Sequence, residues 1–93
     1  MHFVIYDVDR PDAGNLRAET RARHLGYLAA YEMHFAGPLL DSDGEMCGSL
    51  MVIDLPSRVE AVDFAGGDPY AIAGLFESSS ITTFRQVFPP PEN

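Results

Sequence analysis

Tryptophan is absent from the 93-residue sequence, and cysteine occurs only once, as Cys47. A single cysteine excludes an internal disulfide bond. The three histidines share no spacing typical of metal ligands, so we expect no metal site. A chain of this length buries only about 60% of the surface that its unfolded form exposes, and it is marginally stable alone. A partner subunit is therefore the expected source of further burial.

Positive charge is also scarce. Lysine is absent, and six arginines face 14 acidic residues, which gives a net charge of −8 and a pI of about 4.5. A protein that binds nucleic acid needs a basic patch to displace counterions from phosphate, and binding to an anionic membrane surface has the same requirement. The sequence therefore predicts neither a nucleic-acid partner nor a membrane partner.

Long apolar runs are missing as well. No stretch reaches the roughly eighteen apolar residues that a membrane span requires. Residues 1–7 lack the basic region and apolar core of a signal peptide. We therefore expect a soluble, cytoplasmic protein.

What the sequence does contain is a regular succession of secondary-structure patterns. Aromatic and β-branched runs predict strands, apolar residues at helical spacing predict helices, and Pro, Gly and Asp mark the turns. The expected elements are strand 3–8, helix 16–33, strands 34–40 and 49–55 joined by turn 41–44, a helix with a capping box at 57–60 that stops at 66–67, a short helix opening at 68–69, and strand 81–88. Residues 89–93, with three prolines, are expected to form an extended tail.

The order of these elements indicates the fold class. Strand, helix, strand, strand, helix, strand is the ferredoxin-like split βαβ (βαββαβ) pattern, an α+β fold with an antiparallel sheet. We expect residues 1–93 to form a single domain, since a chain of this length rarely divides.

The strand residues indicate how the sheet is covered. Val4, Tyr6 and Val8 point to one face, and Phe3 and Ile5 to the other, so both faces are apolar. Helices can cover only one of these faces. A symmetric homodimer that packs sheet against sheet would cover the second. The alternative is a monomer that exposes a modest apolar patch.

His24 and Asp68 are the main candidates for chemistry. His24 lies on the inward arc of the first helix, where it is either a core histidine satisfied by a backbone carbonyl or a general acid and base, since imidazole titrates near neutrality. Asp68 precedes Pro69 and has the pattern of an N-cap. In this interpretation one carboxylate oxygen caps the helix and the second orients a histidine.

Other residues carry weaker hypotheses. Ser49 and Cys47 are candidate nucleophiles. The presence of serine, histidine and aspartate in a sequence does not show a catalytic triad, because a triad is defined by the positions of the three side chains in space. Further candidate pocket residues, each of which is more often found in a core or at a rim, are Tyr6, Tyr27, Tyr31, Arg21 and Arg85.

Several motifs together give the chain a resemblance to a known family. They are Arg-His-Leu-Gly-Tyr-Leu at 23–28, Gly-Pro-Leu at 37–39, Gly-Ser-Leu at 48–50 with Val-Ile at 52–53, Asp-Pro-Tyr at 68–70, Ala-Gly-Leu-Phe-Glu-Ser at 73–78 and Phe-Arg-Gln-Val-Phe at 84–88. On these motifs the sequence resembles the YciI-like family, also described as the YCII-related domain. The resemblance implies a ferredoxin-like fold that dimerises as an α+β barrel. It also implies a catalytic dyad of His24 and Asp68, with Ser49 as a neighbour.

Two functions remain open at this point. The first is a lyase or isomerase that needs no cofactor, in which His24 transfers a proton to or from a small cyclic substrate and an arginine anchors an anionic group. The second is a non-catalytic binding or accessory module for a small molecule that uses the same cavity. An enzyme requires that His24 contact both Asp68 and an open pocket, whereas a binding module could bury His24 entirely.

Overall fold

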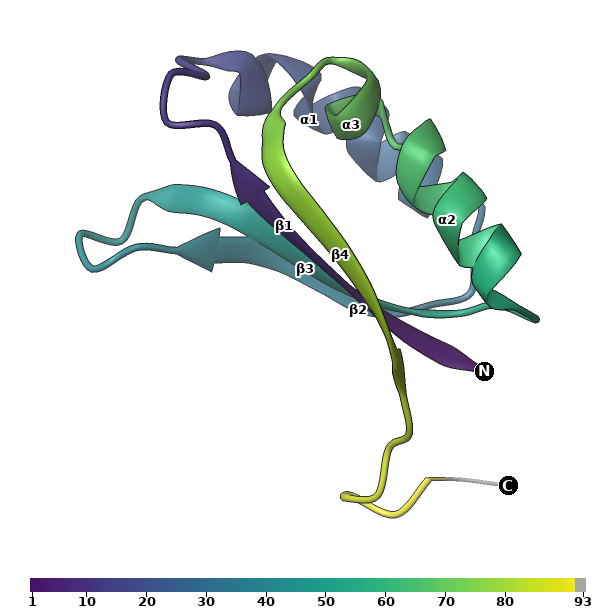
Figure 1. The fold of residues 1–93 in the computed structure, drawn as a ribbon. Coiled ribbons are helices and arrows are strands. Elements are labelled where there is room, and N and C mark those ends of the chain that lie inside the picture. The colour runs from purple at the N-terminus through teal and green to yellow at the C-terminus, as the bar shows by residue number, and fades with distance from the viewer. Residues whose placement is uncertain (92–93) are drawn as a thin grey trace.

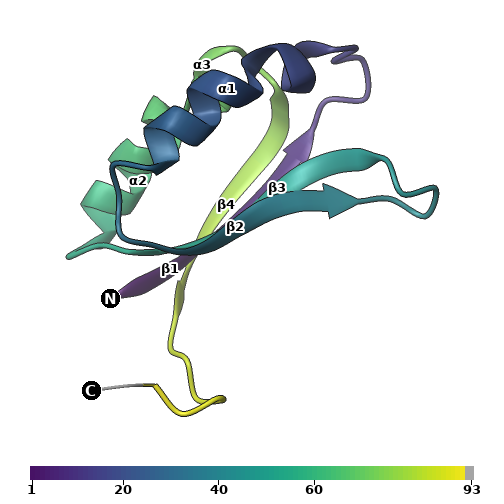
Figure 2. The same ribbon diagram turned by 180° about the vertical axis from the view of Figure 1, so that it is seen from behind.

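A computed structural model describes residues 1–91 of the chain. Its elements are β1 (His2–Asp9), α1 (Leu16–Leu28), β2 (Met33–Leu40), β3 (Met46–Asp54), α2 (Arg58–Gly67), α3 (Pro69–Ile72) and β4 (Phe76–Phe84). The strands form one antiparallel sheet in the order β2-β3-β1-β4. The three helices lie on one side of this sheet and leave the other side open (Figures 1 and 2). The predicted α+β, ferredoxin-like fold is confirmed.

The first helix is shorter than predicted. It ends at Leu28 instead of at residue 33. Non-local pairing overrides local helical spacing here, because the chain turns to join the sheet: the Asp54 N–H donates to the Glu32 carbonyl at 3.0 Å, and Met33 pairs with Ile53 on β3.

The last strand lies earlier in the sequence than predicted. It spans Phe76–Phe84 instead of 81–88. The pairing with β1 sets the length of β4. Residues Asp9 to His2 of β1 pair with β4, and β4 ends opposite His2, where β1 begins. Residues 85–91 form neither helix nor strand. Of the predicted tail at 89–93, residues 92 and 93 lie outside the described part of the chain.

The predicted capping box at the start of α2 does not form. Ser57 is the N-cap residue, but its hydroxyl contacts the Glu60 carboxylate and no backbone N–H is capped by its side chain. The helix still begins where the sequence indicated.

The core lies between the sheet and the helices. Its buried apolar members are Phe3, Ile5, Leu28, Met51, Ile53, Ala61 and Phe64. Phe3 and Ile5 come from β1 and pair with Ile53 and Met51 on β3. The opposite face carries Val4 and Tyr6 and has no helix over it, as the strand pattern predicted. Within residues 1–91, none of the helices combines the length and apolar character needed to cross a membrane.

Candidate functional site

His24 and Asp68 meet beneath the helices. His24 Nδ1 lies 2.7 Å from Asp68 Oδ1, and the two residues are only 6% and 1% exposed. The same Oδ1 accepts the Tyr70 backbone N–H at 3.0 Å, so one oxygen both caps α3 and holds the imidazole. We expected one carboxylate oxygen to cap the helix and the other to orient the histidine. Instead Oδ1 does both, and Oδ2 is buried and has no partner among the described residues.

Close packing between α1 and the end of α2 brings the two residues together. A Cβ on Gly67 would lie 2.5 Å from Tyr27 Oη, so a larger residue here would force the tyrosine side chain to shift. The Tyr27 hydroxyl donates to the Phe64 carbonyl at 2.9 Å and ties α1 to α2. Asp68 follows Gly67 directly and therefore faces α1.

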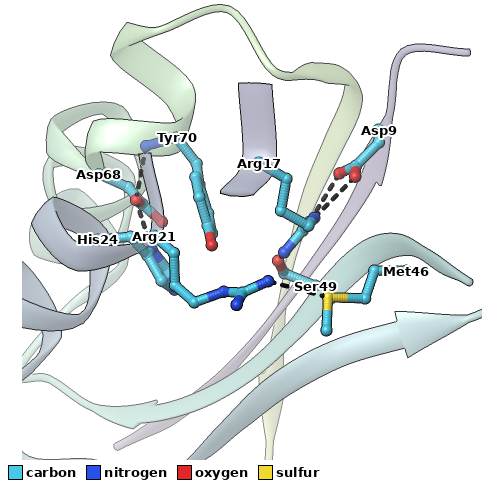
Figure 3. Close-up of polar contacts among 8 residues, drawn as sticks. All are labelled: Asp9, Arg17, Arg21, His24, Met46, Ser49, Asp68 and Tyr70. Atoms are coloured by element: carbon cyan, nitrogen blue, oxygen red, sulfur yellow. Dashed lines mark hydrogen bonds and ion pairs between the residues drawn. The ribbon is translucent and has the colours of Figure 1, made fainter. Parts of the chain in front are cut away.

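Tyr70 forms the centre of a stack that the sequence analysis did not anticipate. Its ring lies 3.9 Å from the His24 ring, centroid to centroid, at an interplanar angle of 19°. The Arg17 guanidinium carbon lies 4.7 Å from the centroid of the same ring. Figure 3 shows these side chains converging, with the tyrosine between the histidine and Arg17. Stacking on both sides of a buried ring fixes the orientation of the imidazole.

Arg17 connects the stack to Ser49. Its Nε and Nη2 donate to the two Asp9 carboxylate oxygens at 2.8 and 2.7 Å, and Nη2 also donates to Ser49 Oγ at 2.9 Å (Figure 3). Burial would lower the pKa of Arg17, but the hydrogen bonds and charge of Asp9 outweigh it and raise that pKa above its ordinary value. Arg17 is therefore a permanent, locally neutralised cation.

A cavity of about 290 Å³ opens beside these residues. Its lining is Arg17, Arg21, His24, Leu25, Leu28, Ala36, Gly37, Pro38, Met46, Ser49 and Tyr70. The volume is at the lower end of small-molecule sites, and the mixture of apolar walls with a few polar groups is typical of them. Arg21 Nη2 contacts Met46 Sδ at 3.5 Å.

A second buried carboxyl lies in the same region. Asp7 is 2% exposed and continues the inward face of β1 that Phe3 and Ile5 begin. Burial, which penalises the charged form, raises the pKa of the Asp7 carboxyl from 3.8 to about 6, and the Ser79 hydroxyl partly opposes this shift. The alternation along β1 could have revealed Asp7 as a buried ionisable group.

The predicted site residues divide into two groups. His24, Asp68, Ser49 and Arg21 come together at or beside the cavity. The others lie elsewhere: Tyr6 is on the open sheet face, Tyr27 and Tyr31 pack against the core, and Arg85 follows β4 in a hollow beside the N-terminus. Cys47 lines a separate hollow near Asp9.

Sequence reasoning missed Arg17, Asp9 and Tyr70. Arg17 is seven positions before His24, which places both on one helix face, so helical spacing was the available indication. Within residues 1–91, no group of three or more His, Cys, Asp or Glu side chains is arranged to hold a metal ion.

Solved structures share this fold. The chain superimposes with a TM-score of 0.86 and 32% identity on 5-chloro-2-hydroxyhydroquinone dehydrochlorinase (TftG) from Burkholderia phenoliruptrix AC1100, solved with 2,5-dihydroxybenzoquinone, over 91% of this chain and 94% of that one. The structure of Rv0793 from Mycobacterium tuberculosis matches with a TM-score of 0.53 and 17% identity, over 94% of this chain and 96% of that one. At this identity the match supports a shared fold and nothing further.

Sequence relatives extend over the same length. Protein YciI from Escherichia coli O6:H1 is 32% identical over 98 positions, which cover 95% of this chain and all of the relative. An uncharacterized protein from Haemophilus influenzae is 30% identical over the same shares. The family described as the YCII-related domain matches residues 1–85. The chain therefore belongs to the YCII-related domain family.

Proposed function

We propose that this protein is a cofactor-independent small-molecule enzyme, of the lyase or isomerase type, in which His24 transfers a proton. The observation that carries this proposal is the 2.7 Å contact between His24 Nδ1 and Asp68 Oδ1 beside a cavity that the histidine itself lines. A histidine with a purely structural role would not need to border a cavity that can hold a small molecule. A histidine held by a carboxylate and bordering a cavity has the arrangement of a general base.

Each nitrogen of the ring has its own role in the proposed reaction. In the proposed tautomer Nδ1–H donates to Asp68 Oδ1, 2.7 Å away, which leaves Nε2 as the basic nitrogen. The negative carboxylate lies directly against the positive charge that forms when Nε2 takes a proton. The stack on Tyr70 keeps the ring in this orientation.

Ser49 and Arg21 are the proposed substrate-binding groups. Ser49 Oγ accepts from Arg17 Nη2, so its own O–H is free to donate to a substrate oxygen. Arg21 borders the cavity, and among the described residues no carboxylate pairs with it. It is therefore available to a negatively charged group on the substrate.

The proposed substrate class is a small hydroxylated ring. TftG, at 32% identity and a TM-score of 0.86, is described as a dehydrochlorinase and holds 2,5-dihydroxybenzoquinone. In an elimination of this kind, Nε2 takes a proton from the substrate, the freed electron pair forms a new double bond, and the leaving group departs with its bonding pair. An isomerisation would return the proton to a different atom.

Chlorinated and unchlorinated trihydroxybenzenes provide the test. We expect the wild-type protein to release chloride or to change the ultraviolet spectrum of the ring. His24→Ala should lower the rate by about 10²–10⁴, while His34→Ala, an exposed histidine on β2, serves as the matched control and should have no effect. Binding of these rings without conversion would reject the enzyme and leave the non-catalytic binding module in its place.

We also propose that a second copy of the chain covers the open face of the sheet. Tyr6 and Phe35 on this face are 47% and 55% exposed, so the open face presents large apolar side chains to solvent. A symmetric pair would bury both. Light scattering should give about twice the 10.2 kDa chain mass, and Phe35→Asp should yield a monomer. A monomeric wild type at micromolar concentration would reject the dimer. The cytoplasmic location stays a prediction.

A further inference from the structure

The Tyr70 hydroxyl is not needed for the contacts that hold Tyr70 in place. The residue is only 2% exposed, yet within residues 1–91 its Oη forms no hydrogen bond of normal distance and angle. The backbone N–H donates to Asp68 Oδ1 at 3.0 Å, and the ring stacks on His24 and meets the Phe76 ring edge-on at 6.1 Å, centroid to centroid. Phenylalanine would make all of these contacts, so packing does not explain the hydroxyl.

The hydroxyl is nevertheless open to the cavity. Within residues 1–91, the side chains that carry an oxygen both sealed from solvent and unpaired are Asp7, Thr20 and Asp68. The Tyr70 hydroxyl is unpaired but not sealed, and Tyr70 lines the cavity of about 290 Å³. Figure 3 shows the hydroxyl pointing away from α3, toward the space between Arg21 and Ser49. A polar group in this position finds its partner in water or in a bound ligand.

Tyr70 and His24 present two reactive edges to the same cavity. Their rings lie 3.9 Å apart at an interplanar angle of 19°, and both residues line the cavity. Groups held side by side in this way can act on neighbouring atoms of one small ring, with no entropy left to lose in bringing them together. The Arg17 guanidinium carbon lies 4.7 Å from the centroid of the Tyr70 ring, so a fixed cation is close by when the hydroxyl gives up its proton.

We propose that Tyr70 is a second catalytic residue, an acid that protonates a substrate oxygen while His24 removes a proton from the neighbouring carbon. This proposal rests on the proposed function. The C–H bond breaks, its proton goes to His24 Nε2, and its electron pair forms a new C=C bond. The π pair of the adjacent C=O moves onto oxygen, which takes the Tyr70 proton. The imidazolium and the tyrosinate that result restore their protonation states by exchange with water.

This pairing of base and acid narrows the substrate class. The ring must carry a carbonyl oxygen next to the carbon that loses its proton, which describes cyclic enolisable ketones and the keto tautomers of hydroxylated rings. Removal of the proton and protonation of the oxygen in one step avoids a full negative charge on the substrate, which general acid catalysis favours.

Tyr70→Phe tests the hydroxyl alone, because phenylalanine keeps the stack and the ring contacts. On the trihydroxybenzenes used to test the proposed function, the variant should lower kcat by about 10² or more. Its affinity for 2,5-dihydroxybenzoquinone, measured by calorimetry, should fall about tenfold, the loss of one hydrogen bond. Tyr6→Phe removes a phenol hydroxyl from the open sheet face and should leave both values as in the wild type.

The outcomes separate this proposal from the proposed function. Wild-type turnover that Tyr70→Phe leaves unchanged would overturn the role of Tyr70 and keep the enzyme. Binding without turnover in the wild type would reject the enzyme, and with it a catalytic role for Tyr70. No binding of the quinone by the wild type would reject the substrate class.

Melting of the ligand-free proteins provides a check that needs no substrate. Tyr70→Phe should melt at or above the wild-type temperature, because the hydroxyl it removes has no partner in the described part of the chain. A clear fall in the melting temperature would show that the hydroxyl stabilises the fold, and would overturn the proposal.

Discussion

Asp7→Asn is expected to make the folded protein more stable above pH 6. An acid whose pKa rises on folding binds its proton more tightly in the folded state than in the unfolded chain. Between pH 4 and pH 6 the folded state therefore carries more protons, and the free energy of unfolding falls as pH rises. Below pH 4 the carboxyl is protonated in both states, and above pH 6 the loss is complete. Asparagine has nearly the same shape and never ionises.

The size of this effect follows from the pKa shift. The Asp7 pKa rises from 3.8 to about 6, and each unit corresponds to about 1.4 kcal/mol. Ionisation of Asp7 thus costs the wild type about 3 kcal/mol at pH 7, a large part of the roughly 5–15 kcal/mol that stabilises a typical domain. The buried Asn amide is expected to lack a full set of hydrogen-bond partners, which cancels about 1 kcal/mol of the gain.

Urea unfolding followed by circular dichroism, at fixed protein concentration and at each pH unit from 4 to 8, measures this difference. The free-energy gap between Asp7→Asn and wild type should grow between pH 4 and pH 6 and stay constant above. Asp63→Asn, at an exposed position on α2, controls for the loss of one negative charge and should show no such growth. A gap that is independent of pH would refute the reasoning, because it would mean that Asp7 titrates alike in both states.

Two further predictions concern packing and ligand binding. Gly67→Ala should lower the melting temperature, because the new Cβ would lie 2.5 Å from Tyr27 Oη. Gly66→Ala is the control, because a Cβ on Gly66 would have no atom within 4 Å. An equal fall in melting temperature in both variants would contradict the packing argument. Arg21→Met should weaken binding of an anionic ring about tenfold, the loss of one partly desolvated charge contact, measured by calorimetry. Arg23→Met, at an exposed arginine on the same helix, should bind the anionic ring normally, and equal affinity in both variants would mean that Arg21 does not contact the anionic group.

The sequence predicted those features that depend on local pattern. Alternation along β1 and helical spacing in α1 identified the sheet faces and the inward position of His24, and the Asp-Pro pair identified the cap at Asp68. Pairing partners were not predictable in the same way. The extent of β4 depends on where β1 begins, and α1 ends where Met33 joins β3, so both depend on residues far away in the sequence.

The same distinction explains which site residues were found. His24 and Asp68 belong to residue types whose chemistry is recognisable alone. Arg17 and Tyr70 acquire their roles only by contact: the guanidinium needs Asp9 from β1 and Ser49 from β3, and the Tyr70 ring needs His24 from α1. Contacts among separate elements have no local pattern in one sequence.

One arginine in the cavity explains how a protein with a net negative charge can bind an anionic ring. Arg17 is neutralised by Asp9 and serves to hold Ser49, so Arg21 is the cation left to act on a ligand. Under the proposed function, His24 removes a proton and negative charge develops on the substrate next to Arg21. A contact that strengthens as charge develops stabilises the transition state more than the bound substrate. Removal of Arg21 should then lower the turnover rate as well as the affinity, a loss that a mere binding module could not show.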